Sequence, residues 1–181
     1  MDNLSKLGKK YGTDKIGKHN YLPVYYEMFK DRRKDIWKVI EIGIAEGASL
    51  FMWRDFFPNA WVYGADNDKA RVDAVRSYRM TTLLCDQTSP DDLRALLEVT
   101  GGDIDLVVDD GSHDPADQVF TCLTVMPLLK KGAVYVIEDV ADPGIAKTIL
   151  KELEVEPRWV NIKECGKRYD DRLVIVGNKN G

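Results

Sequence analysis

The sequence has little of several features that would point to particular classes of protein. Its apolar runs, such as those at residues 106–108 and 133–137, are far shorter than the roughly 20 residues of a membrane-spanning helix. The opening residues Met1-Asp2-Asn3 do not resemble a signal peptide. The three cysteines include no CxxC pair, which fits reduced thiols that pack inside the protein. We therefore expect a cytoplasmic protein with no membrane partner.

Basic residues are not in excess, and histidine is scarce. The chain has 26 Lys and Arg against 30 Asp and Glu, which gives a formal net charge of -4, and it has 2 His. A nucleic-acid-binding surface normally shows clustered Lys and Arg, so we expect no nucleic-acid partner. With 181 residues, 44% of them hydrophobic and 31% charged, the chain is typical of one globular domain.

Short apolar runs alternate with helix-compatible segments from residue 38 onward. Five such alternations predict a parallel sheet with helices on both faces. Two further strand candidates follow with no helix between them, which favours an antiparallel hairpin. The expected strands are 39–42, 61–65, 82–84, 105–108, 133–137, 159–163 and 172–176. The expected helices are 3–10, 22–33, 48–57, 69–78, 90–99, 115–129 and 143–154.

A glycine turn follows the first expected strand. Glu41 ends the strand, Gly43 lies at the turn and Gly47 lies where the next helix begins. Such a turn lets the backbone approach a ligand at a helix N-terminus. The spacing is G-x-x-x-G and not the G-x-G-x-x-G of dinucleotide-binding proteins, so a plain strand-to-helix turn remains an alternative.

Polar residues also end the second and third expected strands. Asp66 comes roughly 20 residues after the glycine turn, where an acid can bind ribose hydroxyls; the alternative is a helix N-cap. Asp86 and Gln87 follow the third strand, where they could read the amine of adenine. Together with the glycine turn, these residues resemble the first three motifs of class I S-adenosylmethionine-dependent methyltransferases. That resemblance implies a doubly wound, seven-stranded, mostly parallel sheet and S-adenosylmethionine as cofactor.

Carboxylates crowd the ends of the fourth and fifth expected strands, in Asp109-Asp110-Gly111-Ser112-His113 and Glu138-Asp139. Like charges at close range destabilise the fold unless a cation joins them, and oxygen-rich sites suit Mg²⁺. His113 is well placed to act as a base at neutral pH. The alternatives are a structural cap for Asp109 and a surface position for His113, and Asp114 and Asp117 are expected to be structural at a helix start.

The motifs VVDDGSH and YVIEDV, with YGTDKIGKHNY at residues 11–21, resemble the metal-dependent sugar O-methyltransferases of macrolide biosynthesis. They are also similar to the cephalosporin hydroxylase-like methyltransferases. The resemblance covers residues 10–140. Asp109 is also expected to contact the cofactor. The resemblance implies Mg²⁺ ligands, a general base, and a loop that closes over the methionine end of the cofactor. In that order the residues are Asp110, Glu138 and Asp139; His113; and Tyr11, Thr13, Lys15 and Tyr21, with Lys15 opposite the methionine carboxylate.

These observations predict one domain, residues 1–181, in which a helical cap and cofactor-covering loop (1–35) precede the catalytic core (36–181). The expected function is methylation of a hydroxyl on a sugar, glycoside or other small molecule. The macrolide enzymes carry a further N-terminal domain, so the acceptor is not specified. A metal-dependent hydroxylase is an alternative, but a set of two histidines and one carboxylate would need His19 of the N-terminal loop. A second alternative is a non-catalytic protein of the same fold that binds S-adenosylmethionine. Such a protein could form a homodimer joined through helix 22–29.

Overall fold

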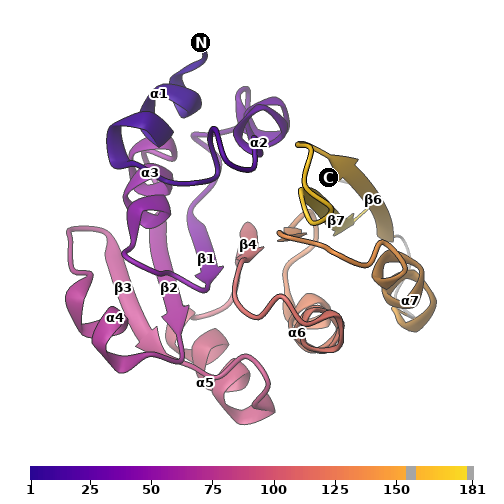
Figure 1. Ribbon diagram of the computed structural model, residues 1–181. Coiled ribbons are helices and arrows are strands. Elements are labelled where there is room, and N and C mark those ends of the chain that lie inside the picture. The colour runs from indigo at the N-terminus through magenta and orange to yellow at the C-terminus, as the bar shows by residue number, and fades with distance from the viewer. Residues whose placement is uncertain (154–157, 179–181) are drawn as a thin grey trace.

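The computed structural model describes residues 1–153 and 158–178 and is centred on a seven-stranded sheet (Figure 1). The strand order is β3-β2-β1-β4-β5-β7-β6. In chain order the strands are β1 (Lys38–Ile42), β2 (Trp61–Asp66), β3 (Met80–Leu84), β4 (Leu106–Asp109), β5 (Val134–Ile137), β6 (Arg158–Glu164) and β7 (Arg172–Asn178). Strands β1 to β5 pair in parallel, and β7 pairs antiparallel with both β5 and β6. The predicted fold class, including the C-terminal hairpin, is confirmed.

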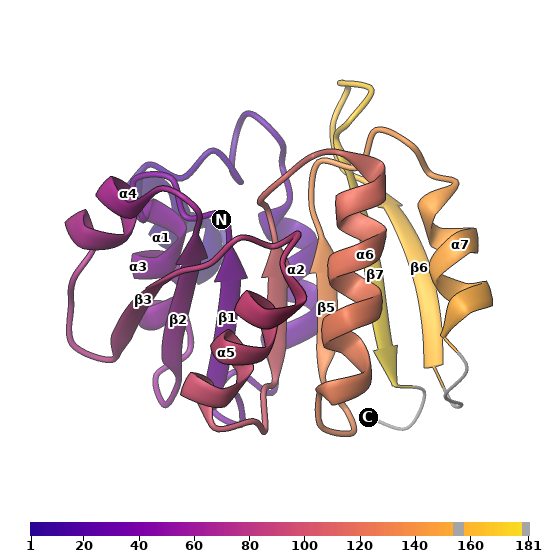
Figure 2. The same ribbon diagram turned by 90° about the horizontal axis from the view of Figure 1, so that it is seen from below.

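Helices cover both faces of this sheet (Figure 2). They are α1 (Asn3–Tyr11), α2 (Leu22–Phe29), α3 (Ala48–Phe56), α4 (Lys69–Ala74), α5 (Pro90–Thr100), α6 (Pro115–Val125) and α7 (Ile145–Glu152), with a 3₁₀ turn at Met126–Leu128. Helices α1 to α4 contribute to one hydrophobic cluster and α5 to α7 to the other. No helix in the described ranges is long and apolar enough to cross a membrane.

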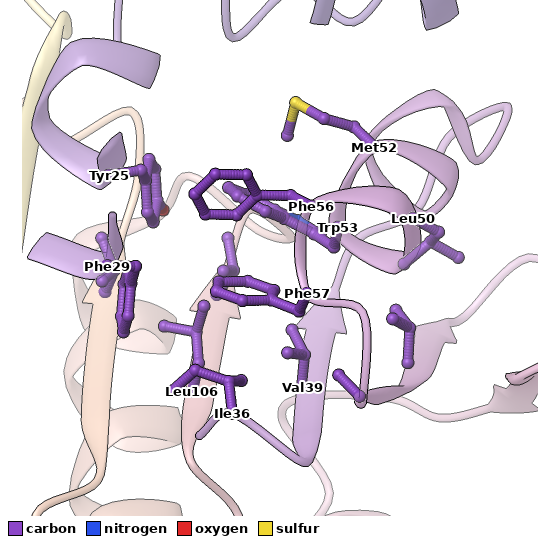
Figure 3. Packing of buried hydrophobic residues seen from close by; sticks show 14 of the residues in the cluster. Tyr25, Phe29, Ile36, Val39, Leu50, Met52, Trp53, Phe56, Phe57 and Leu106 are labelled. Atoms are coloured by element: carbon purple, nitrogen blue, oxygen red, sulfur yellow. The ribbon is translucent and has the colours of Figure 1, made fainter. Parts of the chain in front are cut away.

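Alternation along the strands divides the core between the two faces. In β1, Val39 belongs to the cluster under α1 to α4, and Ile40 belongs to the cluster under α5 to α7. This is the period of two expected for a strand buried on both sides. The first cluster is rich in aromatic rings (Figure 3), with Tyr25 and Trp53 at 4.9 Å between ring centroids. Because both faces are covered, a polar side chain within a strand must find its partners inside the protein.

Several helices end earlier than the sequence predicts. The helix expected at 22–33 stops at Phe29. The one expected at 69–78 stops at Ala74, because Val75 is extended and the Thr82 hydroxyl bonds the carbonyls of Val72 and Val75. The helix expected at 115–129 stops at Val125 and continues as the 3₁₀ turn that contains a proline. The segment expected at 143–154 is helical over Ile145–Glu152, and residue 154 lies outside the described residues.

The loop between α1 and α2, residues 12–21, reaches the carboxyl end of the sheet. Lys15 contacts Glu138 directly after β5, and His19 contacts Asp171 just before β7. These contacts place the N-terminal loop beside the carboxyl ends of the central strands, the edge at which open α/β sheets bind ligands.

Candidate active site

A cavity of about 620 Å³ lies at the carboxyl ends of the parallel strands. Each strand from β1 to β5 ends at it, and the loop at residues 12–21 forms part of its wall. Representative lining residues are Lys15, Gly43, Asp66, Asp86, Asp110 and Asp139. Its volume falls in the range of small-molecule and cofactor sites. Five of the strand-end residues that the sequence singled out therefore meet at one cavity: Asp66, Asp86, Gln87, Asp110 and Asp139.

The glycine turn is required by the backbone geometry. Gly43 has a φ of 82°, and a Cβ there would lie 2.1 Å from the carbonyl oxygen of Asp110. Gly47 has a φ of 79° and is the N-cap of α3, although it does not line the cavity. Glycine is favoured in both places because other residues rarely adopt positive φ. The turn brings the N-terminus of α3 to the cavity, as an adenosyl cofactor requires.

Asp66 is tied to this glycine turn. It is buried, and its carboxylate accepts hydrogen bonds from the backbone N–H groups of Ile44 at 3.0 Å and Asp68 at 2.9 Å. The N-cap of α4 is Asp68, whose side chain accepts from Ala70. The alternative of a helix N-cap therefore does not apply to Asp66, and its carboxylate lines the cavity beside the turn.

Asp86 and Gln87 differ in their surroundings. Asp86 lines the cavity and accepts hydrogen bonds from the N–H and hydroxyl of Thr88. Gln87 also lines the cavity but is buried, and its amide donates to Asp109 and Thr121 and accepts from the backbone N–H of Ser112. Gln87 thus braces the loop that carries His113, and its amide groups are already used within the protein.

Alternation along β4 and β5 separates the acidic pairs. Asp109 continues the side of Val107 and accepts from Tyr135 at 2.7 Å, beneath the cavity. Burial raises the pKa of Asp109 to about 7, although the hydrogen bonds from Tyr135 and Gln87 oppose the increase. Glu138 continues the opposite side, with Val136, and accepts from the hydroxyl of Tyr25 at 2.5 Å. The first acid of each pair is therefore held inside the protein by a tyrosine.

Lys15 is the cation among these buried acids. Its Nζ lies 2.7 Å from Asp110, 2.7 Å from Glu138 and 3.1 Å from Glu41, and its side chain is 1% exposed. Burial lowers the pKa of Lys15, but the three carboxylates outweigh that effect and raise it well above the usual value. Burial raises the pKa of Glu41, and it raises that of Glu138 to about 8. Lys15 thus contacts protein carboxylates, whereas the resemblance predicted the methionine carboxylate of the cofactor.

A group of three side chains faces the cavity: Asp110, His113 and Asp139. Each offers an atom, and these atoms all lie within 4.8 Å of one another. His113 Nε2 is 3.6 Å from Asp110 Oδ1 and 3.7 Å from Asp139 Oδ2. Carboxylate oxygens are the ligands that Mg²⁺ prefers, so Asp110 and Asp139 fit such an ion. Glu138, predicted as a ligand, lies outside this group and contacts Lys15 and Tyr25.

His113 is half-exposed at the start of the loop into α6. Its contact with Asp110 raises its pKa, burial opposes the increase, and the charge of Asp139 adds to it. A higher pKa makes the imidazole a stronger proton acceptor but reduces its unprotonated fraction near neutral pH. His113 thus lies beside the two carboxylates, where the sequence analysis expects a base.

Asp139 is held from its other side by the N-terminal loop. The Tyr21 hydroxyl donates to Asp139 Oδ1 at 2.5 Å, and His19 Nδ1 lies 3.3 Å from the same oxygen. His19 Nδ1 also lies 2.9 Å from Asp171 Oδ1. His19 and His113 therefore approach opposite oxygens of Asp139, and His19 is not in the group that could hold a metal.

Tyr11 and Thr13 lie away from the cavity. The Tyr11 hydroxyl contacts Lys10 and Asp55, and its ring stacks on Phe51 of α3. The Thr13 hydroxyl accepts from the backbone of Lys15 at 3.4 Å. Glu41, Asp109 and Tyr21 are buried and do not line the cavity either. Of the four residues predicted to cover the methionine end of the cofactor, only Lys15 therefore lines the cavity.

The sequence analysis missed three supporting residues: His19, Tyr25 and Asp171. Each contacts a strand-end acid or a partner of one. Tyr25 lies on an apolar helix, and Asp171 precedes the last strand, so neither carries a local sequence signal. Only the period of two along β4 and β5 could have indicated that one acid of each pair faces inward.

Comparisons with known proteins identify a family and relatives for this chain. The sequence profile of a family described as "Methyltransferase domain" matches residues 40–140. The 8-demethyl-8-alpha-L-rhamnosyl tetracenomycin-C 2'-O-methyltransferase of Streptomyces olivaceus is 39% identical over 147 residues, which are 77% of this chain and 38% of that protein. The mycinamicin VI 2''-O-methyltransferase of Micromonospora griseorubida is 36% identical over 146 residues, which are 76% of this chain and 36% of that protein. The chain thus spans less than two fifths of the length of these relatives.

A solved structure is similar over almost the whole chain. It is the MycE methyltransferase from the mycinamycin biosynthetic pathway in complex with Mg, SAH and mycinamycin VI. The TM-score is 0.78 at 27% sequence identity, and the match covers 99% of this chain and 56% of that one. The similarity therefore includes the N-terminal loop and the C-terminal hairpin as well as the central sheet.

Proposed function

The chain belongs to the methyltransferase-domain family, and on that premise we propose that it methylates a hydroxyl oxygen of a sugar, glycoside or other small molecule. S-adenosylmethionine would donate the methyl group and Mg²⁺ would bind at the site. The observation that carries the proposal is the group of Asp110, His113 and Asp139, which shares one cavity with the glycine turn. A base, oxygen ligands for a cation and a nucleoside-sized pocket together fit methyl transfer to oxygen.

The relatives support the class of acceptor. Both curated relatives are named as O-methyltransferases, and one name specifies a rhamnosyl compound. The MycE structure contains Mg, SAH and a mycinamycin. A glycosylated small molecule is therefore the acceptor that we propose for this chain.

The cofactor would lie between the glycine turn and the ends of β2 and β3. Gly43 of the turn and Ser49 at the N-terminus of α3 would face it, Asp66 would accept hydrogen bonds from ribose hydroxyls, and Asp86 would border the adenine. Gln87 would act indirectly, by fixing the loop at Ser112. Of the other residues predicted to contact the cofactor, Lys15 lines the cavity, and the rest would support the site from behind its lining.

Asp110 and Asp139 would hold the metal, with Glu138 as a third candidate ligand. Glu138 Oε2 and Asp110 Oδ2 each lie 2.7 Å from the same Lys15 nitrogen, so Glu138 is next to the group. Bound Mg²⁺ would supply positive charge that lowers the pKa of a coordinated acceptor hydroxyl. Metal titrations of Glu138→Gln and Asp139→Asn would show whether Glu138 contributes.

His113 Nε2 would take the proton of the acceptor hydroxyl. As the new bond from oxygen to the methyl carbon forms, the bond from that carbon to the sulfonium breaks, and S-adenosylhomocysteine leaves. The walls of the cavity would hold donor and acceptor at near-attack distance, which supplies much of the acceleration. No further activation of the sulfonium is needed.

The test compares wild type with His113→Ala on a panel of glycosides, with Mg²⁺ or with EDTA. We expect a Mg²⁺-dependent methyl ether product from wild type. In the variant, kcat should fall by about 10² to 10⁴-fold, while calorimetry should show an unchanged Kd for S-adenosylhomocysteine. Full turnover by the variant would remove His113 as the base, and cofactor binding without methylation of any hydroxyl would favour the non-catalytic alternative.

The remaining expectations stay predictions. They are a cytoplasmic location, the absence of nucleic-acid and membrane partners, a homodimer as one form of the protein, and the division into a cap at 1–35 and a core at 36–181. Gel filtration with light scattering would test the dimer.

A further inference from the structure

Asp139 adopts a backbone conformation that is unusual for its residue type. Its φ is 51°, in the left-handed region that residues with a side chain seldom occupy. Such conformations persist where the surrounding contacts determine them, and they cluster at functional sites. The contacts that hold Asp139 therefore help to determine the direction in which its carboxylate points.

Tyr21 contacts Asp139 at two atoms. Its hydroxyl donates to Oδ1 at 2.5 Å and lies 3.3 Å from the backbone N–H of Asp139, from which it accepts. Tyr21 is fully buried at the N-terminus of α2. With Oδ1 engaged in this way, Oδ2 is the oxygen that faces His113, at 3.7 Å.

A second contact fixes the position of Tyr21 itself. Its ring stacks on His19, with 5.2 Å between centroids and 22° between planes, and His19 is bonded to Asp171 at 2.9 Å. These contacts thus join the N-terminal loop, the end of β5 and the residue before β7. They lie inside the protein, behind the lining of the cavity.

We propose that Tyr21 is a positioning residue for the metal site: its hydroxyl fixes Asp139 so that Oδ2 faces His113 and the carboxylate stays in the group with Asp110, and the N-terminal loop thereby sets the affinity for the metal. The inference rests on the proposed function, because it takes Asp139 as a metal ligand. Groups that orient the ligands of a metal contribute substantially to its binding. Without the hydroxyl, the Asp139 carboxylate is free to rotate away from the shared position.

The test is the Tyr21→Phe variant, titrated with Mg²⁺ by calorimetry and with Mn²⁺ by electron paramagnetic resonance, without cofactor or acceptor. We expect the Kd for each metal to rise about tenfold or more, with thermal unfolding still cooperative. Wild-type Kd values in the folded variant would overturn the inference.

Tyr135→Phe is the matched control. It also removes a buried tyrosine hydroxyl bonded to an aspartate, here Asp109 at 2.7 Å, on the other side of the sheet. We expect it to lower the melting temperature by a similar amount and to change the metal Kd less than twofold. Equal weakening by both variants would mean that any loss of a buried hydroxyl loosens the site, which contradicts a specific role for Tyr21.

Two further measurements separate the outcomes. If Tyr21→Phe does not fold, His19→Leu removes the neighbouring imidazole, whose Nδ1 lies 3.3 Å from Oδ1, and it should also weaken metal binding, by less. Unchanged binding in folded His19→Leu would then overturn the inference. Wild type that binds neither metal would refute the metal site of the proposed function, whereas wild-type binding that persists in Tyr21→Phe refutes this inference alone.

Discussion

Two charge networks formed by the N-terminal segment differ sharply in their surroundings. The buried network consists of Lys15, Glu41, Asp110 and Glu138, and the surface network consists of Lys10, Tyr11, Arg54 and Asp55. Lys15 is 1% exposed, whereas Lys10 is 58% exposed. The two lysines are close in sequence and both contact carboxylates, so the comparison isolates the effect of burial.

Burial changes what each ion pair contributes. In the interior, one ammonium must balance three carboxylates, of which Glu41 and Glu138 are buried away from water, and its removal leaves them uncompensated. At the surface, water and salt screen the same attraction. The buried network therefore determines the structure around the cavity, while the surface network only attaches α1 to α3.

The largest expected effect is that of Lys15→Met, which breaks the buried network. The variant leaves Glu41, Asp110 and Glu138 without their shared cation. We expect the free energy of unfolding to fall by about 3–5 kcal/mol, measured by urea denaturation at neutral pH.

Lys18→Met is the control for that loss. Lys18 lies in the same loop, and its side chain is 50% exposed and paired with Asp14. Its removal should cost about 0–1 kcal/mol. If Lys15→Met cost no more than Lys18→Met, the distinction between the two networks would fail.

A smaller effect is expected when a neutral partner of the buried network is removed. Tyr25→Phe deletes the hydroxyl that donates to Glu138 at 2.5 Å and leaves the ring in the aromatic core. The loss should be about 1–3 kcal/mol in urea denaturation, because a buried acceptor loses its donor. Tyr26→Phe, in the same helix but half-buried, should cost less; equal losses would show that burial of the hydroxyl does not matter.

Asp55→Asn tests the surface network through pH. Partial burial tends to raise the pKa of Asp55, but hydrogen bonds from Tyr11, Arg54 and Lys10 outweigh it and lower the pKa to about 2. A carboxylate with a lowered pKa stabilises the fold above its ordinary pKa, and this stabilisation is lost as the pH falls toward 2. Wild type should exceed the variant by up to about 1 kcal/mol at pH 7, and the gap should shrink below pH 4. A gap that widens in acid would contradict the sign.

The smallest expected effect is that of Lys10→Gln. The lysine is exposed, and Arg54 also contacts Asp55 and Tyr11. The melting temperature should therefore stay within measurement error at low and high salt. A clear, salt-sensitive decrease would mean that the surface network is more than an attachment of α1.

The sequence was informative about the fold because its signals are local. Apolar runs, starting prolines and a missing crossover helix predicted the strands, the helices and the hairpin. Helix ends were less predictable: α4 ends where the Thr82 hydroxyl bonds the carbonyls of its last turn, and that contact comes from a strand formed later in the chain.

The site was predictable where sheet geometry alone decides it. Parallel strands bring Asp66, Asp110 and Asp139 to one edge whatever the helices do. The roles of Tyr11, Lys15 and Tyr21 depend on how the N-terminal segment packs, since Tyr11 goes with α3 while the other two reach the central acids. Contacts at such long range leave no trace in local spacing.

The bond between His19 and Asp171 joins positions that are 152 residues apart. During synthesis, the glycine turn and the carboxylates at the ends of β1 to β5 are made before Asp171, so the contact between His19 and Asp171 can form only after them. Because Asp171 immediately precedes β7, the contact that anchors the N-terminal loop can form only after nearly the whole sheet has been synthesised.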